Sequence, residues 1–432
     1  MQDKNFVPFT KEMIKDYTIL VPNMLPMHFK LIASVMKNYG YNFELLQNDG
    51  PEIAETGLKF THNDTCYPAI LVVGQFMDAL LSGKYDLHKT ALIMFQTGGG
   101  CRASNYISLI RKALKKANME YIPVISFSLS GLEKHTGFEM NLKKLQQMIY
   151  AVLYGDLLMN LVNQVRPFEI TKGDAENLAN EWVEKLGAEL GTSNRIKYKN
   201  IRQNYIKIVD SFKTIPCEMR DAVKVGVVGE IFVKYSPLAN NDLERFIIRE
   251  GGQPIVPGLL DFCLYVVYNR IADYIIYKKK PLVYFASKIL YNFLNQKRAD
   301  ISEALTESNR FEGLTPFNKI VTMTDGLISQ AVQMGEGWLL TAEMVELSDS
   351  GCKNIVCTQP FGCLPNHICG KGMMKPIKEL CPDVNIVAID YDAGASRVNQ
   401  ENRLKLMLAN AKKKLSKHKV TNEKNQFEFA YN

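Results

Sequence analysis

The sequence predicts an α/β protein in which two lobes, each built on a parallel sheet, are joined by a helical segment. Two observations carry this prediction. Short, continuously apolar runs alternate with helical patterns in residues 1–141 and again in residues 223–432. Between them, residues 142–222 show mainly the three- and four-residue spacing of helices. Strands of a parallel sheet are apolar on both faces because helices cover them, so such runs indicate buried parallel strands.

The first lobe, residues 1–141, contains four short apolar runs separated by helical stretches. Each run is bounded by turn residues and is too short for a buried helix. We expect strands over 17–22, 43–46, 91–95 and 121–126, with helices around 29–36, 69–81 and 104–117.

The helical connector, residues 142–222, has a brief break at Arg166-Pro167. Strand patterns return after it, in residues 223–432. There a Gly251-Gly252 pair ends one predicted helix in the manner of a C-cap. We expect strands over 223–229, 254–256, 354–356 and 385–389, a helix over 242–250, and mostly helical structure over 259–309. Both lobes are therefore predicted to be Rossmann-like.

Composition and charge narrow the function classes. The 432 residues carry 52 basic and 45 acidic side chains, a net charge of +7, and the basic run at 412–419 is typical of a solvated helix end. No basic stripe interleaved with aromatics occurs elsewhere, so we expect no nucleic-acid binding. The N-terminus has no signal-like apolar region and no run of about 20 apolar residues occurs, so we expect a cytoplasmic protein without a membrane partner. Its nine cysteines are then expected to be reduced.

The first cysteine motif is Asn-Asp-Thr-Cys-Tyr-Pro at 63–68, directly before a predicted helix. Pro68 suits the first turn of that helix. The helix N-terminus would favour a thiolate at Cys66, since its partial positive charge stabilises an anion. The alternative is a buried apolar cysteine.

The second motif, at 96–106, reads Gln-Thr-Gly-Gly-Gly-Cys-Arg-Ala-Ser-Asn-Tyr and follows a predicted buried strand. Open α/β sheets place ligands at this end of their strands. Gly98, Gly99 and Gly100 allow a close approach of backbone N–H groups to a ligand beside Cys101. A phosphate-binding loop is the alternative, although the spacing of known glycine-rich phosphate motifs is absent.

The third motif contains four of the nine cysteines: Cys352, Cys357, Cys363 and Cys369. Their spacings of five, six and six differ from the paired cysteines of zinc ribbons. Zinc bound with the help of His367 stays an alternative. Iron–sulfur clusters accept thiolates from scattered loops, which suits this pattern better.

The other features give less information. Cys263 lies in an apolar helical run, Cys217 and Cys381 lie beside prolines, and all three are expected to have packing or turn roles. The loops 229–237 and 390–396 follow predicted strands, where they either carry functional groups or are ordinary capped loops. The motifs of serine hydrolases, zinc proteases and kinases are absent, and we assign no catalytic residue.

Taken together, these motifs resemble the 2-hydroxyacyl-CoA dehydratase component family. The resemblance rests on the Cys66 loop, on residues 97–106, on 359–367 with its Gln-Pro-Phe-Gly-Cys-Leu-Pro-Asn-His run, on 389–392 and on 226–252. More narrowly, the chain is similar to the dehydratase-like module associated with acyl-CoA dehydratase activases, which is related to double-cubane cluster proteins.

The resemblance implies an iron–sulfur protein with a 4Fe–4S cluster held by three cysteines, which leaves one iron open. It assigns Cys66, Cys101 and Cys363 as ligands, with Cys357 as a fourth candidate and Cys352 and Cys369 as weaker ones. Gly98, Gly99, Gly100 and Gly362 would offer backbone N–H groups to the cofactor. A double-cubane 8Fe–9S cluster is the alternative cofactor.

The resemblance also implies a partner and an activity. An ATP-hydrolysing activase with its own iron–sulfur cluster would deliver low-potential electrons for the reductive dehydration or reduction of a small substrate, such as an acyl-CoA. The protein would act as a lyase, or alternatively as an ATP-dependent reductase without a CoA substrate, or as a non-catalytic electron relay or regulatory subunit. It would form a homodimer or a heterodimer.

Overall fold

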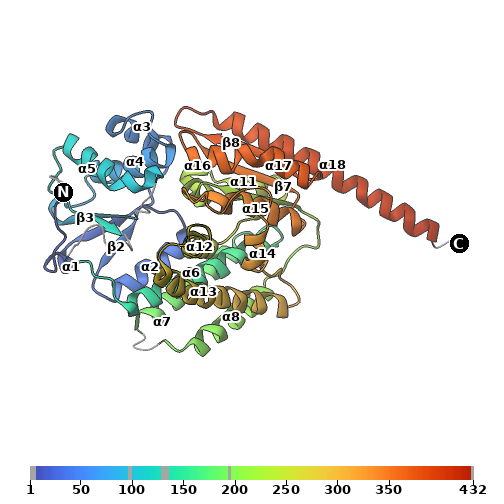
Figure 1. The fold of residues 1–432 in the computed structure, drawn as a ribbon, viewed down its shortest axis with the longest axis horizontal. Helices are drawn as coiled ribbons and strands as arrows, with labels where there is room; N and C mark the ends of the chain where they lie inside the picture. Colours follow the sequence, from blue (N-terminus) through green and yellow to red (C-terminus); the bar gives the residue numbers. More distant parts are fainter. Residues whose placement is uncertain (1–5, 96–99, 128–135, 193–195, 430–432) are drawn as a thin grey trace.

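A computed structural model describes residues 6–95, 100–127, 136–192 and 196–429 and confirms the predicted fold class (Figure 1). It contains two four-stranded sheets in which all neighbouring strands are parallel. Within the described ranges no helix is both long and apolar enough to cross a membrane.

The N-terminal sheet has the strand order β2-β1-β3-β4. Its strands are β1 (Thr18–Val21), β2 (Asn42–Leu45), β3 (Thr90–Phe95) and β4 (Val124–Phe127). The strands agree with the expected positions to within a few residues. The accompanying helices are α1 (Met13–Asp16), α2 (Pro26–Lys37), α3 (Pro51–Phe60), α4 (Tyr67–Leu81) and α5 (Tyr106–Lys116), with short 3-10 turns η1 (Leu87–Lys89) and η2 (Arg102–Asn105).

Helix α3 was not predicted from the sequence, and it packs closely on α4. A Cβ atom on Gly74 would lie 2.0 Å from the carbonyl oxygen of Ile53, and one on Gly57 would lie 2.1 Å from that of Ile70. Only glycine at these two positions permits the observed contact of the two backbones. This packing holds the start of α4, where Cys66 lies.

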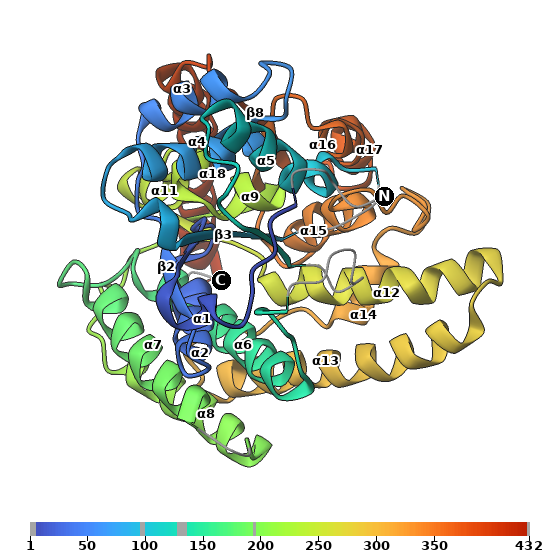
Figure 2. The same ribbon diagram turned by 90° about the vertical axis from the view of Figure 1, so that its left-hand side faces the viewer.

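The helical part of the molecule extends beyond residues 142–222. Its core combines α6 (Leu142–Val165), α7 (Asp174–Thr192) and α8 (Tyr198–Lys213) with three later helices. These are α12 (Leu259–Tyr277), α13 (Pro281–Glu307) and α14 (Phe317–Thr322), whose buried side chains belong to the same hydrophobic cluster (Figure 2).

The C-terminal sheet has the order β6-β5-β7-β8. Its strands are β5 (Val223–Gly229), β6 (Gly252–Ile255), β7 (Asn354–Pro360) and β8 (Asn385–Tyr391), all at or near their predicted positions. Around it lie α9 (Ile231–Tyr235), α10 (Pro237–Asn240), α11 (Leu243–Arg249), α15 (Gly337–Asp349), α16 (Leu364–Cys369), η3 (Lys371–Met373), α17 (Met374–Leu380) and α18 (Arg397–Phe429). Helix α18 projects from the body of the molecule (Figure 1).

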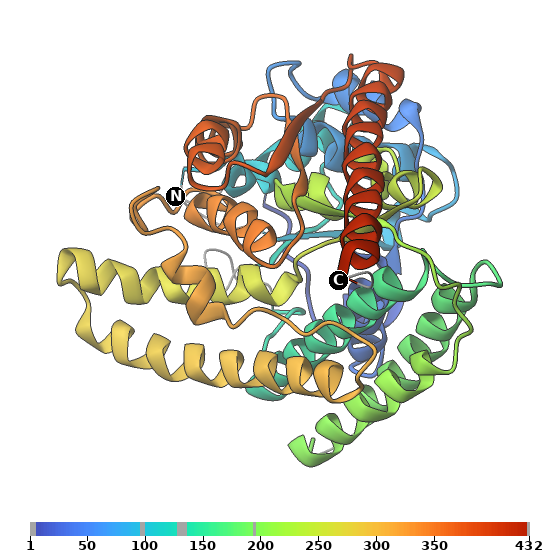
Figure 3. The same ribbon diagram turned by 90° about the vertical axis from the view of Figure 1, so that its right-hand side faces the viewer.

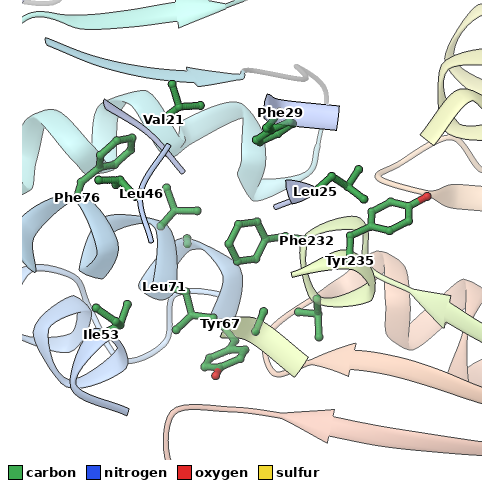
Figure 4. Close-up of a cluster of buried hydrophobic side chains, with 14 of the residues drawn as sticks. Val21, Leu25, Phe29, Leu46, Ile53, Tyr67, Leu71, Phe76, Phe232 and Tyr235 are labelled. Atoms are coloured by element: carbon green, nitrogen blue, oxygen red, sulfur yellow. The ribbon is translucent and has the colours of Figure 1, made fainter. Parts of the chain in front are cut away.

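The two lobes pack directly on each other. Phe232 and Tyr235 of α9 lie among side chains of the N-terminal lobe, including Leu25, Phe29 and Tyr67 (Figure 4). This single hydrophobic cluster contains residues from both sheets. The carboxyl ends of β3, β5 and β7 are thereby brought to one region between the lobes.

Candidate metal centre between the lobes

Three of the predicted ligands occupy equivalent local positions. Cys66, Cys101 and Cys363 each immediately precede a helix, namely α4, η2 and α16. Their carbonyl oxygens accept first-turn hydrogen bonds from the N–H groups of Ala69 (3.0 Å), Ser104 (3.1 Å) and His367 (3.2 Å). Each cysteine thus stands at the start of a helical segment, the end at which the first backbone N–H groups have no intrahelical acceptor.

Backbone contacts bring the Cys66 and Cys363 loops together across the two lobes. The N–H of Tyr67 donates to the carbonyl of Phe361 at 3.2 Å. A Cβ atom on Gly362, whose φ is +74°, would lie 3.4 Å from the Cα of Cys66. Gly362, which was predicted to contact the cofactor, therefore lies between Cys66 and Cys363.

Cys101 belongs to the same group. The guanidinium of Arg102 donates to the carbonyl of Asp64 at 3.0 Å, which ties the Cys101 loop to the Cys66 loop. The hydroxyl of Tyr106 lies 3.7 Å from the Cys66 sulfur. Burial is the main cause that raises the pKa of Tyr106, and ionisation of Cys66 or Cys101 would raise it further.

Burial is the main influence on all three thiols. It raises the pKa of Cys101 to about 11 and also raises the pKa of Cys66 and Cys363. The negative charge of Glu230 raises the pKa of each thiol further, and Glu336 does so for Cys101 and Cys363. Without a bound cation, these sulfurs are therefore protonated at neutral pH.

Two carboxyl groups of the C-terminal lobe act on these thiols, the buried Glu336 and the partly exposed Glu230. Glu230 precedes α9 and accepts a hydrogen bond from the N–H of Val233 at 2.9 Å, while Glu336 accepts one from Ile231 at 2.9 Å. Burial raises the pKa of both, and the proximity of Glu336 raises that of Glu230 further. Two like charges in such a place favour retention of a proton.

The sequence reasoning missed this pair. Glu230 lies in the 229–237 loop, which was noted without a role, and its position after a buried strand was the available clue. Glu336 lies in an irregular stretch before α15, and no local pattern distinguishes it. Only tertiary packing makes the two carboxyl groups neighbours.

The other predicted ligands lie in the hydrophobic core of the C-terminal lobe. Cys357 is fully buried in β7, with its sulfur 3.8 Å from the Asn366 side-chain oxygen. It shares a hydrophobic cluster of the C-terminal lobe with Cys352 and Cys369. The ring of His367 contacts the Gln359 amide at 2.5 Å. Cys352, Cys357 and Cys369 are thus placed as core side chains.

The remaining predicted positions are the glycines beside Cys101 and the three cysteines outside the motifs. Gly98 and Gly99 lie outside the described residues. A Cβ on Gly100 would lie 2.9 Å from the Met334 methyl carbon, so this loop also contacts the C-terminal lobe. Cys263 packs against the helical core, and Cys217 lies 3.0 Å from the Arg310 guanidinium. Cys381 packs at the edge of the C-terminal core.

Within the described ranges, no three His, Cys, Asp or Glu side chains are grouped closely enough to hold one metal ion. A cubane binds each cysteine through a different iron, so its ligands surround the cluster and do not converge on one point. Three cysteines that come from three different loops are compatible with that geometry.

Compared with known protein families and with curated proteins, the chain matches none of them.

Proposed function

We propose that this protein holds a 4Fe–4S cluster through Cys66, Cys101 and Cys363 and accepts low-potential electrons from an ATP-hydrolysing activase. The electrons would serve the reductive dehydration or reduction of a small substrate in the cytoplasm. The observation that carries the proposal is the meeting of three helix-starting cysteines from both lobes, joined by the contact of Tyr67 with Phe361.

When bound, such a cluster would supply one-electron transfer and an open iron that acts as a Lewis acid. The chain itself would contribute three functions. The backbone N–H groups at the starts of α4, η2 and α16 favour negative charge on the cysteine sulfurs. The Tyr106 hydroxyl can donate to the Cys66 sulfur, and the Glu230–Glu336 pair holds a proton in the same buried region. A general acid that retains such a proton can give it to a substrate hydroxyl, which then leaves as water.

A single cubane is favoured over the double-cubane cluster. A second cubane needs additional thiolates at the same site. Cys352, Cys357 and Cys369 are enclosed in the core of the C-terminal lobe, with less than 3% of each side chain exposed. Those positions support core packing and do not favour a second set of ligands.

Anaerobic purification with iron and sulfide analysis tests the cofactor. We expect about four irons per chain, whereas about eight would indicate the double cubane. Single Cys66→Ser, Cys101→Ser and Cys363→Ser variants should lose cluster absorbance, while Cys381→Ser, on a residue of the C-terminal core edge, should keep it. Zinc without iron, or unchanged iron in all three variants, would contradict the proposal.

Activity is tested separately, with the cluster-loaded protein, an activase, ATP and a strong reductant. Consumption of a 2-hydroxyacyl-CoA supports the lyase, and reduction of a small substrate without CoA supports the reductase. A cluster that is reduced by the activase but passes its electron only to another protein would identify a relay and contradict the catalytic part of the proposal.

A further inference from the structure

Helix α13 has apolar side chains on two opposite faces, and only one of them is covered. Tyr291, Leu294 and Ile301 are buried in the helical core. Leu282, Phe285, Ile289 and Phe293 are 84%, 60%, 73% and 38% exposed. Their spacing of three, four and four residues places them along one stripe of the helix, and at 100° per residue this stripe lies opposite the buried seam.

The exposed stripe belongs to a larger apolar surface on a projecting hairpin. The tip of the hairpin of α12 and α13 extends beyond its neighbouring helices in Figures 2 and 3. Further exposed apolar residues on it are Val266, Ile275, Ile276, Tyr277, Val283 and Leu290. Together with the stripe these make ten exposed apolar side chains on one hairpin, although Val283 and Leu290 lie on a different face of α13 from the stripe. Exposed apolar side chains gathered in this way are typical of an interaction surface.

A groove lies next to Phe293, the last residue of the exposed stripe. Phe293, together with Leu142, Leu145, Ile149 and Ile196, lines an open depression of about 450 Å³ between α13 and the start of α6. The surface therefore combines a protruding part with a hollow part. A shaped combination of this kind suits a folded protein partner better than a fluid lipid surface.

The charges of α13 are distributed unevenly along its length. Lys278, Lys279 and Lys280 stand exposed at the hairpin tip, directly before α13 begins. The C-terminal end of the helix carries the exposed Glu303 and Glu307. Two copies of α13 that pair antiparallel would place basic ends opposite acidic ends, whereas parallel pairing would place like charges together.

We propose that this surface is the interface of a homodimer in which two α13 helices pack antiparallel about a two-fold axis near Ile289. Phe285 and Phe293 lie four residues to either side of Ile289, or about 6 Å each along the axis. The symmetry therefore places Phe285 of one copy at Phe293 of the other. Leu282 and the hairpin tip then reach the groove of the partner, so the protruding and hollow parts fill each other.

The mass of the cluster-loaded full chain in solution tests this interface, measured by light scattering and sedimentation. We expect a dimer at micromolar concentration. Phe285→Asp and Ile289→Asp should weaken association at least 100-fold, because each buries a charge in the interface. Leu406→Asp provides a matched control, since Leu406 is a 65% exposed apolar residue on α18. A monomer at all concentrations, or a dimer that neither variant weakens, would overturn the proposal.

Cross-linking tests the symmetry independently of stability. Ile289→Cys lies at the proposed axis and should form a covalent dimer with a short bis-maleimide, above the wild-type background. Leu282→Cys is at least as exposed but far from the axis, so it should not cross-link to its own copy. Efficient cross-linking of Leu282→Cys would indicate parallel pairing and refute the arrangement. Monomers that bind anionic phospholipid vesicles through the hairpin would show that the surface serves a membrane instead.

Discussion

The backbone N–H of Tyr67 donates a 3.2 Å hydrogen bond to the carbonyl oxygen of Phe361, although the two residues belong to different lobes. This bond joins the residue after Cys66 to the loop before Cys363. The distance between these two cysteines therefore depends on how the lobes pack, so substitutions at the lobe contact should also change the proposed metal centre.

Gly362 offers a direct test of this dependence. Gly362→Val should lower both stability and cluster content, because a side chain there meets the Cys66 backbone. We expect a loss of about 1–3 kcal/mol beyond that of Gly83→Val. Gly83 has the same φ of +74° and no atom within 4 Å of an added Cβ, so it controls for backbone strain alone. Urea unfolding and iron analysis measure the two effects, and equal losses in both variants would argue against the contact.

Asp156 of α6 holds three parts of the molecule together. Its carboxylate lies 2.7 Å from His28 Nε2 of α2 and accepts hydrogen bonds from the N–H groups of Leu259 and Leu260 at 2.8 Å each. Asp156→Ala should cost about 3–5 kcal/mol, because it leaves buried partners unsatisfied.

An exposed ion pair provides the comparison for Asp156. Asp349→Asn removes the partner of Lys319, and both side chains are about half exposed, so the loss should stay below about 1 kcal/mol. Equilibrium unfolding in urea measures both variants. A small loss for Asp156→Ala would show that the three contacts contribute little to stability.

Glu343 gives the protein a pH-dependent stability. Burial raises its pKa to about 7, although its ion pair with Lys234 acts in the opposite direction. Between pH 4.5 and about 7 the folded state then binds more protons than the unfolded state, so the free energy of unfolding falls as pH rises. Glu343→Gln should flatten this part of the curve, measured by urea unfolding from pH 4.5 to 8. An unchanged slope would rule out Glu343 as its source.

The cysteine thiols should react slowly in the protein when the proposed cluster is not bound. The pKa of Cys101 is raised to about 11, so its alkylation by iodoacetamide should accelerate about tenfold per pH unit between pH 8 and 10. Cluster assembly should release protons, since bound cysteines are thiolates. Mass spectrometry of the labelled peptides and pH-stat titration measure these effects. Rapid labelling of Cys101 at pH 7.5 would contradict them.

The sequence was sufficient for local structure. Residues 223–229 are apolar except for Lys224, and β5 has those same limits, because a strand that is covered on both faces is apolar over most of its length. Cys66 and Cys101 were recognisable at helix starts for a similarly local reason: proline and glycine mark where a helix can begin.

Tertiary structure alone decided which of these local features meet. Cys357 and Cys363 lie in one motif, yet one points into the core of its lobe and the other lies at the lobe contact. Glu336 joins Glu230 only because the chain before α15 folds back on α9. The local sequence determines which residues favour a helix or a strand and which face of each element is buried. The pairing of side chains over a hundred residues apart follows from how two hydrophobic lobes pack, and no short pattern records that.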